Sequence, residues 1–168
     1  MAFTYANNII TQTGTDTDLS GLSGLTGVTT TTIGQITTYS LANNILLNIN
    51  GDCFIDPRIN ELETTRVNST AITIAGTLTL GEEIIYTYGS QYTSGRALNV
   101  IGGASVPWAA IITVTGTLNW YGCEVETAST LQINAGGLCK IRDGVFISRL
   151  GDHSIQQGNT IAFQTGST

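Results

Sequence analysis

Apolar and polar residues alternate with a period of two along most of the chain, and the clearest example is ITIAGTLTL, residues 72–80. This alternation predicts a β-strand with one buried, apolar face. The central member of the apolar set is Gly76, which has no side chain to bury and weakens a strand interior. We therefore expect this glycine to have a structural purpose.

The same glycine-centred pattern recurs along the chain. Matching segments are LNINGDCFI (47–55), LNVIGGASV (98–106), ITVTGTLNW (112–120) and, with extra residues, LQINAGGLCKI (131–141). The central glycines are separated by 25, 26, 14 and 20 residues: Gly51, Gly76, Gly102, Gly116 and Gly136. Intervals of 20 residues or more suit one turn of a β-solenoid per repeat. The interval of 14 places residues 98–106 either on a different side of the same turn or in a different terminal element.

A glycine can mark a tight corner between two short strands, because it has no Cβ and reaches unusual backbone angles cheaply. If the alternation continues through each corner, the inward residues of successive turns stack into ladders. The expected ladders are Leu47, Ile72, Ile112 and Leu131; Ile49, Ile74, Val114 and Ile133; Cys53, Leu78 and Leu118; and Ile55, Leu80 and Trp120.

The predicted fold is therefore all-β, a short parallel β-helix (β-solenoid) over residues 36–168, preceded by an extended N-terminal arm, residues 1–35. The arm contains LSGLSGLTG, whose period of three is neither that of a helix nor that of a strand. An ordinary flexible N-terminus is the alternative for this segment. An antiparallel β-sandwich or jelly roll, with glycines in hairpins or bulges, is the alternative for the fold.

Composition narrows the classes of function. Charged residues make up 11% of the chain, and the formal net charge is −6. Six scattered basic residues do not form the cluster that nucleic-acid binding requires. The apolar stretches are too short to span a bilayer, and the first residues do not resemble a signal peptide. The three cysteines are an odd number, which favours buried thiols in a reducing cytosol over disulfides.

Candidate chemistry is sparse. The single histidine, His153, has no recognisable nucleophile motif beside it. Glu124 and Glu126 are the best acid pair for polysaccharide cleavage, since they share one strand face, but without basic or aromatic groups nearby a solvated face is the favoured interpretation. Neither zinc-ligand spacing nor a calcium-loop motif is present. We expect no catalytic residue, no metal site and no cofactor.

Two groups of residues are candidates for contacts with a partner protein. Apolar residues of the arm would become ordered against another protein. Aromatic residues are common in protein contacts and also line carbohydrate sites, although a partly buried loop packed against the solenoid is an equal alternative. The candidates are Leu19, Leu22, Leu25 and Val28 of the arm, and Tyr86, Tyr88, Tyr92 and Trp108.

The stretch IITQTGTDTDLSGLSGLTGVTTTTIGQITTY, residues 9–39, resembles N-terminal stretches of structural virion proteins from tailed bacteriophages. The strands that follow resemble short β-helices of phage spikes, fibres and capsid decoration proteins. The resemblance implies a homotrimer in the virion, made in the host cytoplasm, that decorates or cements the capsid by binding the major capsid protein or another virion protein. The arm would be the attachment element. The attachment part of a tailspike or tail fibre is one alternative, and a carbohydrate-active β-helix protein is another.

Overall fold

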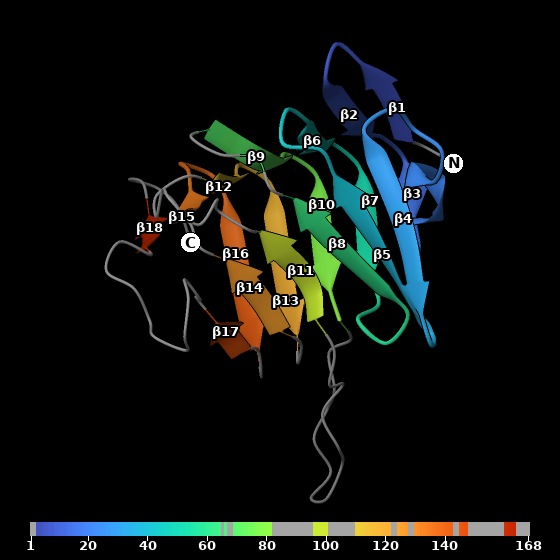
Figure 1. Cartoon of the computed structure of the whole chain (residues 1–168). Coiled ribbons are helices and arrows are strands. Elements are labelled where there is room, and N and C mark those ends of the chain that lie inside the picture. The colour runs from blue at the N-terminus through green and yellow to red at the C-terminus, as the bar shows by residue number, and fades with distance from the viewer. Residues whose placement is uncertain are drawn as a thin grey trace, which may run out of the picture.

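The computed structural model describes residues 3–64, 66, 69–81, 96–100, 110–121, 124–127, 130–142, 145–147 and 160–163. Most of these residues lie in β-strands (Figure 1). The described part also contains one 3₁₀ helix, η1 (Ser20–Leu22), and no α-helix. The prediction of an all-β protein is confirmed.

The strands form three sheets. Sheet A contains, in spatial order, β1 (Phe3–Ala6), β2 (Ile9–Gln12), β6 (Leu46–Ile49), β9 (Ser69–Ile74), β12 (Ala110–Val114), β15 (Thr130–Ile133) and β18 (Thr160–Phe163). Sheet B contains β16 (Leu138–Arg142), β13 (Thr117–Tyr121), β10 (Thr77–Leu80), β7 (Asp52–Ile55) and β3 (Thr15–Asp16). Sheet C contains β17 (Val145–Ile147), β14 (Glu124–Thr127), β11 (Arg96–Val100), β8 (Asn60–Thr64), β5 (Ile36–Leu41) and β4 (Val28–Ile33).

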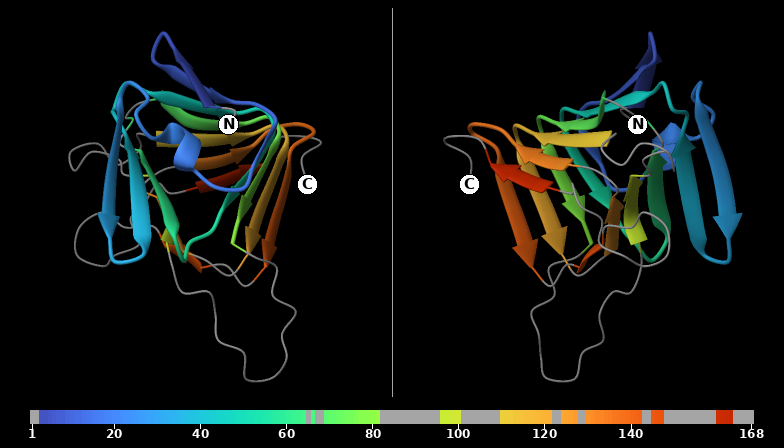
Figure 2. Two further views of the ribbon diagram at one scale, coloured as in Figure 1. Left: turned by 90° about the vertical axis from the view of Figure 1, so that its right-hand side faces the viewer. Right: turned by 60° about the vertical axis from the view of Figure 1, so that its left-hand side comes forward.

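From β6 onward the chain visits sheets A, B and C in the same order again and again, adding one strand to each sheet. Seen from the N-terminal end, the three sheets lie as the sides of a triangle (Figure 2, left). Described neighbours pair in parallel except β1 with β2 and β4 with β5. An antiparallel sandwich or jelly roll does not match this pairing.

The inward ladders occur as predicted. Leu47 pairs with Ile72, and Ile72 in turn pairs with Ile112. In sheet B, Leu78 lies between Cys53 and Leu118. All members of the four ladders are buried and belong to one apolar core cluster. The strand period of two therefore places the apolar side chains inside the triangle, where their burial favours folding.

The corner between sheets A and B explains the central glycine. A Cβ added to Gly76 would collide with backbone atoms of the preceding turn, including the carbonyl oxygen of Gly51 and, at 2.6 Å, the carbonyl carbon of Asn50. Gly116 lies against Gly76 in the same way. The Gly76 N–H donates to the Ile49 carbonyl at 2.9 Å, so the corners are also hydrogen-bonded to each other. Successive turns can pack backbone on backbone here only because no side chain intervenes.

Two repeats differ from the predicted pattern. Leu98 pairs with Leu62 in sheet C, so the segment around Gly102 belongs to a different side of the turn, which explains the short interval of 14 residues. Gly102 itself lies outside the described residues. In the fifth repeat Gly137, rather than Gly136, packs on the previous turn: a Cβ added to Gly137 would collide with the Val114 carbonyl.

The first 35 residues do not form a separate extended arm. Their strands β2, β3 and β4 add to sheets A, B and C, respectively, and several of their apolar side chains belong to the common core. Two tight hairpins shape this region. Asn7 and Asn8 adopt positive φ between β1 and β2, and Gly34 does so between β4 and β5, as two-residue hairpin loops require.

Candidate functional site

The N-terminal end of the stack is the part where the sequence predicts partner contacts, and its leucines turn inward. Leu19 and Leu22 are fully buried in the core, so the prediction that these two residues contact a partner is wrong. Leu25 and Val28 are partly buried and pack against the same core. The open end of an apolar stack must be covered, and these leucines cover it. We call residues 17–27 the cap.

The backbone of the cap explains its period of three. Short turns follow one another, with the N–H of Leu22 donating to Leu19 O at 2.9 Å, that of Leu25 to Leu22 O at 3.2 Å and that of Val28 to Leu25 O at 3.1 Å. Gly24 and Gly27 adopt a φ of +79°, which L-residues with a side chain avoid. One turn every three residues therefore accounts for the spacing of the leucines in the cap.

Asp18 fixes the beginning of the cap. Its Oδ1 accepts a hydrogen bond from the Ser20 backbone N–H at 2.7 Å. Hydrogen bonds from the side chain and backbone of Ser20 lower the pKa of Asp18, because they stabilise its charged form. Across the cap, burial raises the pKa of Tyr39, and the negative charge of Asp18 adds to this effect.

Gln12 connects β3 and the residue before it to the first corner. It is fully buried and occupies the ladder position that Ile49 has in the next turn. Its Oε1 accepts the Gly51 N–H at 3.0 Å, and its Nε2 donates to Gly14 O at 3.2 Å, Asp16 Oδ2 at 2.9 Å and Asp52 O at 3.1 Å. Sequence reasoning missed this residue. The signal was a polar residue at an apolar position of the alternating pattern.

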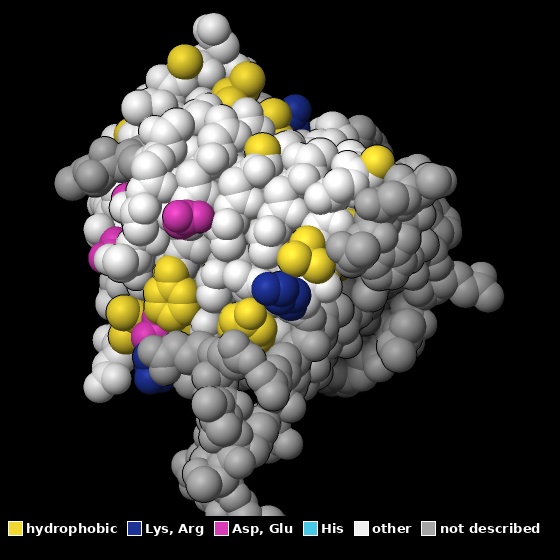
Figure 3. Space-filling view, turned by 180° about the vertical axis from the view of Figure 1, so that it is seen from behind, with side chains coloured by type: hydrophobic (Ala, Val, Ile, Leu, Met, Phe, Trp, Pro, Cys, Tyr) yellow, Lys and Arg dark blue, Asp and Glu magenta, His cyan; other side chains and the backbone are white. Residues whose placement is uncertain are grey.

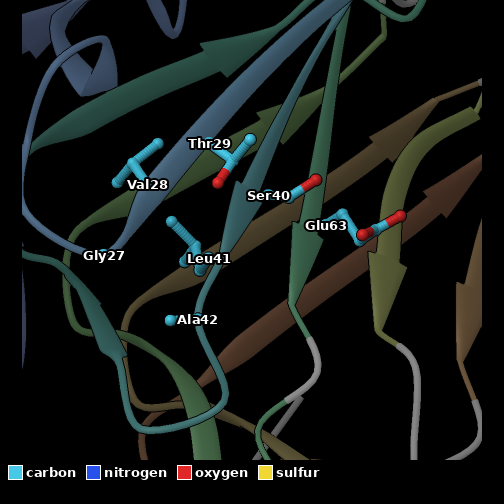
Figure 4. Close-up of a pocket in the computed structure, with 7 residues that line it drawn as sticks. All are labelled: Gly27, Val28, Thr29, Ser40, Leu41, Ala42 and Glu63. Carbon is cyan, nitrogen blue, oxygen red and sulfur yellow. The ribbon is translucent and has the colours of Figure 1, made fainter.

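An open groove of about 370 Å³ lies beside the base of the β4–β5 hairpin (Figure 4). Its described lining comes from β4, β5, β8 and the residues that flank the first two: Gly27, Val28, Thr29, Ser40, Leu41, Ala42 and Glu63. Two hydroxyls and one carboxylate can hydrogen-bond a polar ligand. Among the described lining residues, Glu63 supplies one carboxylate, whereas glycoside cleavage ordinarily uses two. Val28 is the predicted partner-contact residue that lies on this groove.

The β4–β5 hairpin, residues 28–41, is the most exposed element near the cap. Strand β4 is exposed from Thr29 to Ile33, and the side chain of Ile33 is 79% exposed. Ile36, opposite Ile33 in the same hairpin, is also exposed. Ile59 is exposed too and lies beside Ile36, because the Thr37 N–H donates to the Ile59 carbonyl at 2.8 Å. Sequence reasoning missed this apolar cluster, because the isoleucines are far apart in the sequence.

Charged side chains are sparse over the described surface. Seen from behind, most of that surface is uncharged polar side chain and backbone (Figure 3). Arg58 binds the Asp56 carboxylate with an N–O distance of 2.6 Å, and this side-chain hydrogen bond lowers the pKa of Asp56. Among the described residues, no three His, Cys, Asp or Glu side chains are placed to hold a metal ion.

Glu124 and Glu126 occupy alternate positions of β14, as the strand period predicts. Their side chains, His153 and Cys123 lie outside what the structure describes. Cys53 is buried, and desolvation raises the pKa of its thiol to about 12. Desolvation also raises the pKa of Cys139 to about 11. Both thiols stay protonated at neutral pH and are weak nucleophiles there.

The four aromatic candidates for partner contacts, Tyr86, Tyr88, Tyr92 and Trp108, lie outside the described residues. Within the part of the chain that the structure describes, there is no helix with the length and apolar character needed to span a bilayer. No family model, no curated protein and no solved structure matches the chain.

Proposed function

We propose that the chain forms a short parallel β-helix and serves as a structural protein of a tailed-bacteriophage virion. The repeated visits to sheets A, B and C and the parallel pairing support the fold. The resemblance of residues 9–39 to N-terminal stretches of such virion proteins supports the role.

The observation that carries the proposal is the register of sheet B. Strands β7, β10, β13 and β16 pair residue for residue without a shift, and they are continuous with the buried ladders. Stacking of this kind gives a stiff body whose outer face is available for contacts. A stiff body with a mostly uncharged exterior suits repeated binding on a particle, where many weak contacts add up.

In this proposal the protein is a homotrimer that decorates or cements the capsid by binding the major capsid protein or another virion protein. The buried leucines of the cap do not make the contact. The exposed parts of the N-terminal region, such as the β4–β5 hairpin, take the attachment role that the sequence assigned to an arm.

Purified phage particles that encode this chain test the proposal directly. We expect mass spectrometry to find the protein in the particles, and electron micrographs to show density on the particle surface that is lost when its gene is deleted. Light scattering of the purified protein should give at least the mass of a trimer, three times 17.7 kDa. Absence of the protein from particles, with wild-type particle structure after deletion, would overturn the virion role.

A further inference from the structure

The free edge of β4 is an unusual surface in a folded protein. β4 is the last strand of sheet C, and β5 is its only described neighbour. Five of its six residues are exposed. An exposed edge strand offers unpaired backbone groups to other strands, and natural proteins usually protect it with charges, proline or a bulge. VTTTTI contains neither charge nor proline, and its pairing with β5 has no register shift.

The outward backbone groups of β4 can be identified. The Ala42 N–H donates to Gly27 O at 2.8 Å, which makes these two residues a hydrogen-bonded pair of the antiparallel ladder. Hydrogen-bonded and non-hydrogen-bonded pairs alternate, so Thr29 and Thr31 bond to β5 while Thr30 and Thr32 point their N–H and C=O groups away from it. The Val28 N–H also points outward but already donates to Leu25 O.

The charges of the chain favour contact between copies at this end. Of six basic and twelve acidic residues, only Asp16 and Asp18 precede residue 52. Two copies that each carry a net charge of −6 repel one another unless they meet through an uncharged surface. The β4–β5 hairpin contains no charged residue, and exposed Ile33 and Ile36 at its tip would gain from burial.

We propose that two copies of this chain pair antiparallel along their β4 edges about a twofold axis at Thr31. In this register Thr30 hydrogen-bonds to Thr32 of the partner subunit, and the partner subunit's Thr30 to Thr32, which satisfies every outward group identified above. β4 also lies further out than the cap at this end (Figure 2, right), so a second copy can approach it. Closed twofold contacts are the commonest form of self-association.

A cysteine crosslink tests the register with the full chain. In a non-hydrogen-bonded antiparallel pair the Cα atoms are about 4.5 Å apart, within disulfide range. We expect Thr31→Cys to form a disulfide-linked dimer in mild oxidant, seen on a non-reducing gel. Gln35→Cys is the matched control: it is exposed on the same hairpin but lies four residues from the axis. Equal crosslinking of both variants, or of neither, would contradict the proposal.

The assembly state provides an independent test. A twofold contact gives an assembly with an even number of chains, either a dimer or two trimers joined. We expect Thr32→Pro to halve the mass measured by light scattering. Proline removes only the outward N–H of Thr32, so the bonds to β5 remain. Thr32→Val keeps the N–H and should keep the mass. A monomer or a lone trimer for the wild-type chain would overturn the twofold contact while leaving the virion role open.

Discussion

Glycines occur beside apolar residues both at the corner between sheets A and B and in the cap, but for different structural reasons. At the corner, Gly76 and Gly116 pack directly on the backbone of the preceding turn. In the cap, Gly24 has open space around its Cβ position and a φ of +79°. Space between turns selects glycine at the corner, whereas backbone angle selects it in the cap.

This difference accounts for what each segment does with its leucines and isoleucines. Glycine at the corner preserves the period of two, so the apolar residues on both sides of it remain in their ladders. Glycine at positive φ in the cap breaks any strand, and the chain turns every three residues instead. Leu19 and Leu22 then cover the end of the stack that the ladders form.

The substitution Gly76→Ala breaks the corner most severely. Its methyl group would meet backbone atoms of Gly51 and Asn50 rather than a side chain that can move away. We expect the free energy of unfolding to fall by about 3 kcal/mol or more, at or above the usual cost of overpacking. Urea denaturation followed by circular dichroism measures this loss.

Gly24→Ala is the matched control for the corner. Here the added methyl group has nothing within 4 Å, and only the left-handed backbone opposes it. The expected cost is about 1–2 kcal/mol, the usual cost of placing an L-residue in that region. A loss for Gly76→Ala no greater than that for Gly24→Ala would show that the turns do not pack backbone on backbone.

Leu22→Ala tests whether the cap belongs to the core. Leu22 is fully buried, so its truncation should lower the free energy of unfolding by about 3 kcal/mol, as for other buried leucines. Leu25→Ala, at a partly buried position of the same segment, should cost about 1 kcal/mol. Similar, small losses for both variants would indicate that the cap is detached in solution, as an extended arm would be.

The sequence predicts the stack better than the cap for a physical reason. A ladder depends on a local period of two and on glycine-centred corners, and both are visible in single segments such as residues 72–80. The burial of Leu19 depends on an apolar end that exists only after several turns have stacked. Low local content of core formers therefore indicated an arm, although the missing core came from elsewhere in the chain.

The exposed β4 edge and the isoleucines near it were harder still to predict from the sequence. The outward groups of Thr30 and Thr32 follow from strand order, because β4 is an edge only if nothing pairs with its other side. The cluster of Ile33, Ile36 and Ile59 forms across two strands and a turn. Only the scarcity of charge before residue 52 is visible directly in the sequence, and it becomes informative once these residues share one end of the fold.

Gln12→Leu tests the side-chain hydrogen bonds that connect β3 to the first corner. The leucine fits the apolar ladder position but removes the side-chain partner of the Gly51 N–H, the Asp16 carboxylate and the Asp52 carbonyl. The Gly14 carbonyl keeps its hydrogen bond from the Asp52 N–H. We expect a loss of about 2 kcal/mol, because unpaired buried polar groups cost more than the apolar contact returns. Gln12→Glu keeps one acceptor for Gly51 N–H, and should recover part of the loss below the pKa of the new carboxyl group. A stabilised Gln12→Leu variant would mean that the hydrogen bonds are unnecessary.

The buried thiols give the mildest test of the stack. Burial raises the pKa of Cys53 to about 12 from the ordinary thiol value of 9.0, so the folded protein keeps the proton at a pH where the unfolded chain loses it. Its contribution to stability is therefore complete below about pH 9 and is lost as the pH rises from about 9 to 12.

We expect iodoacetamide at pH 9 to modify half-buried Cys139 before buried Cys53, with peptide mapping by mass spectrometry as the readout. Modification of Cys53 should follow the rate of unfolding and increase in Leu22→Ala, because loss of the cap opens the ladder that contains it. If the cap does not close the stack, Leu22→Ala will leave the rate at Cys53 unchanged. Rapid modification of Cys53 in the wild-type protein would contradict its place in the ladder beside Leu78.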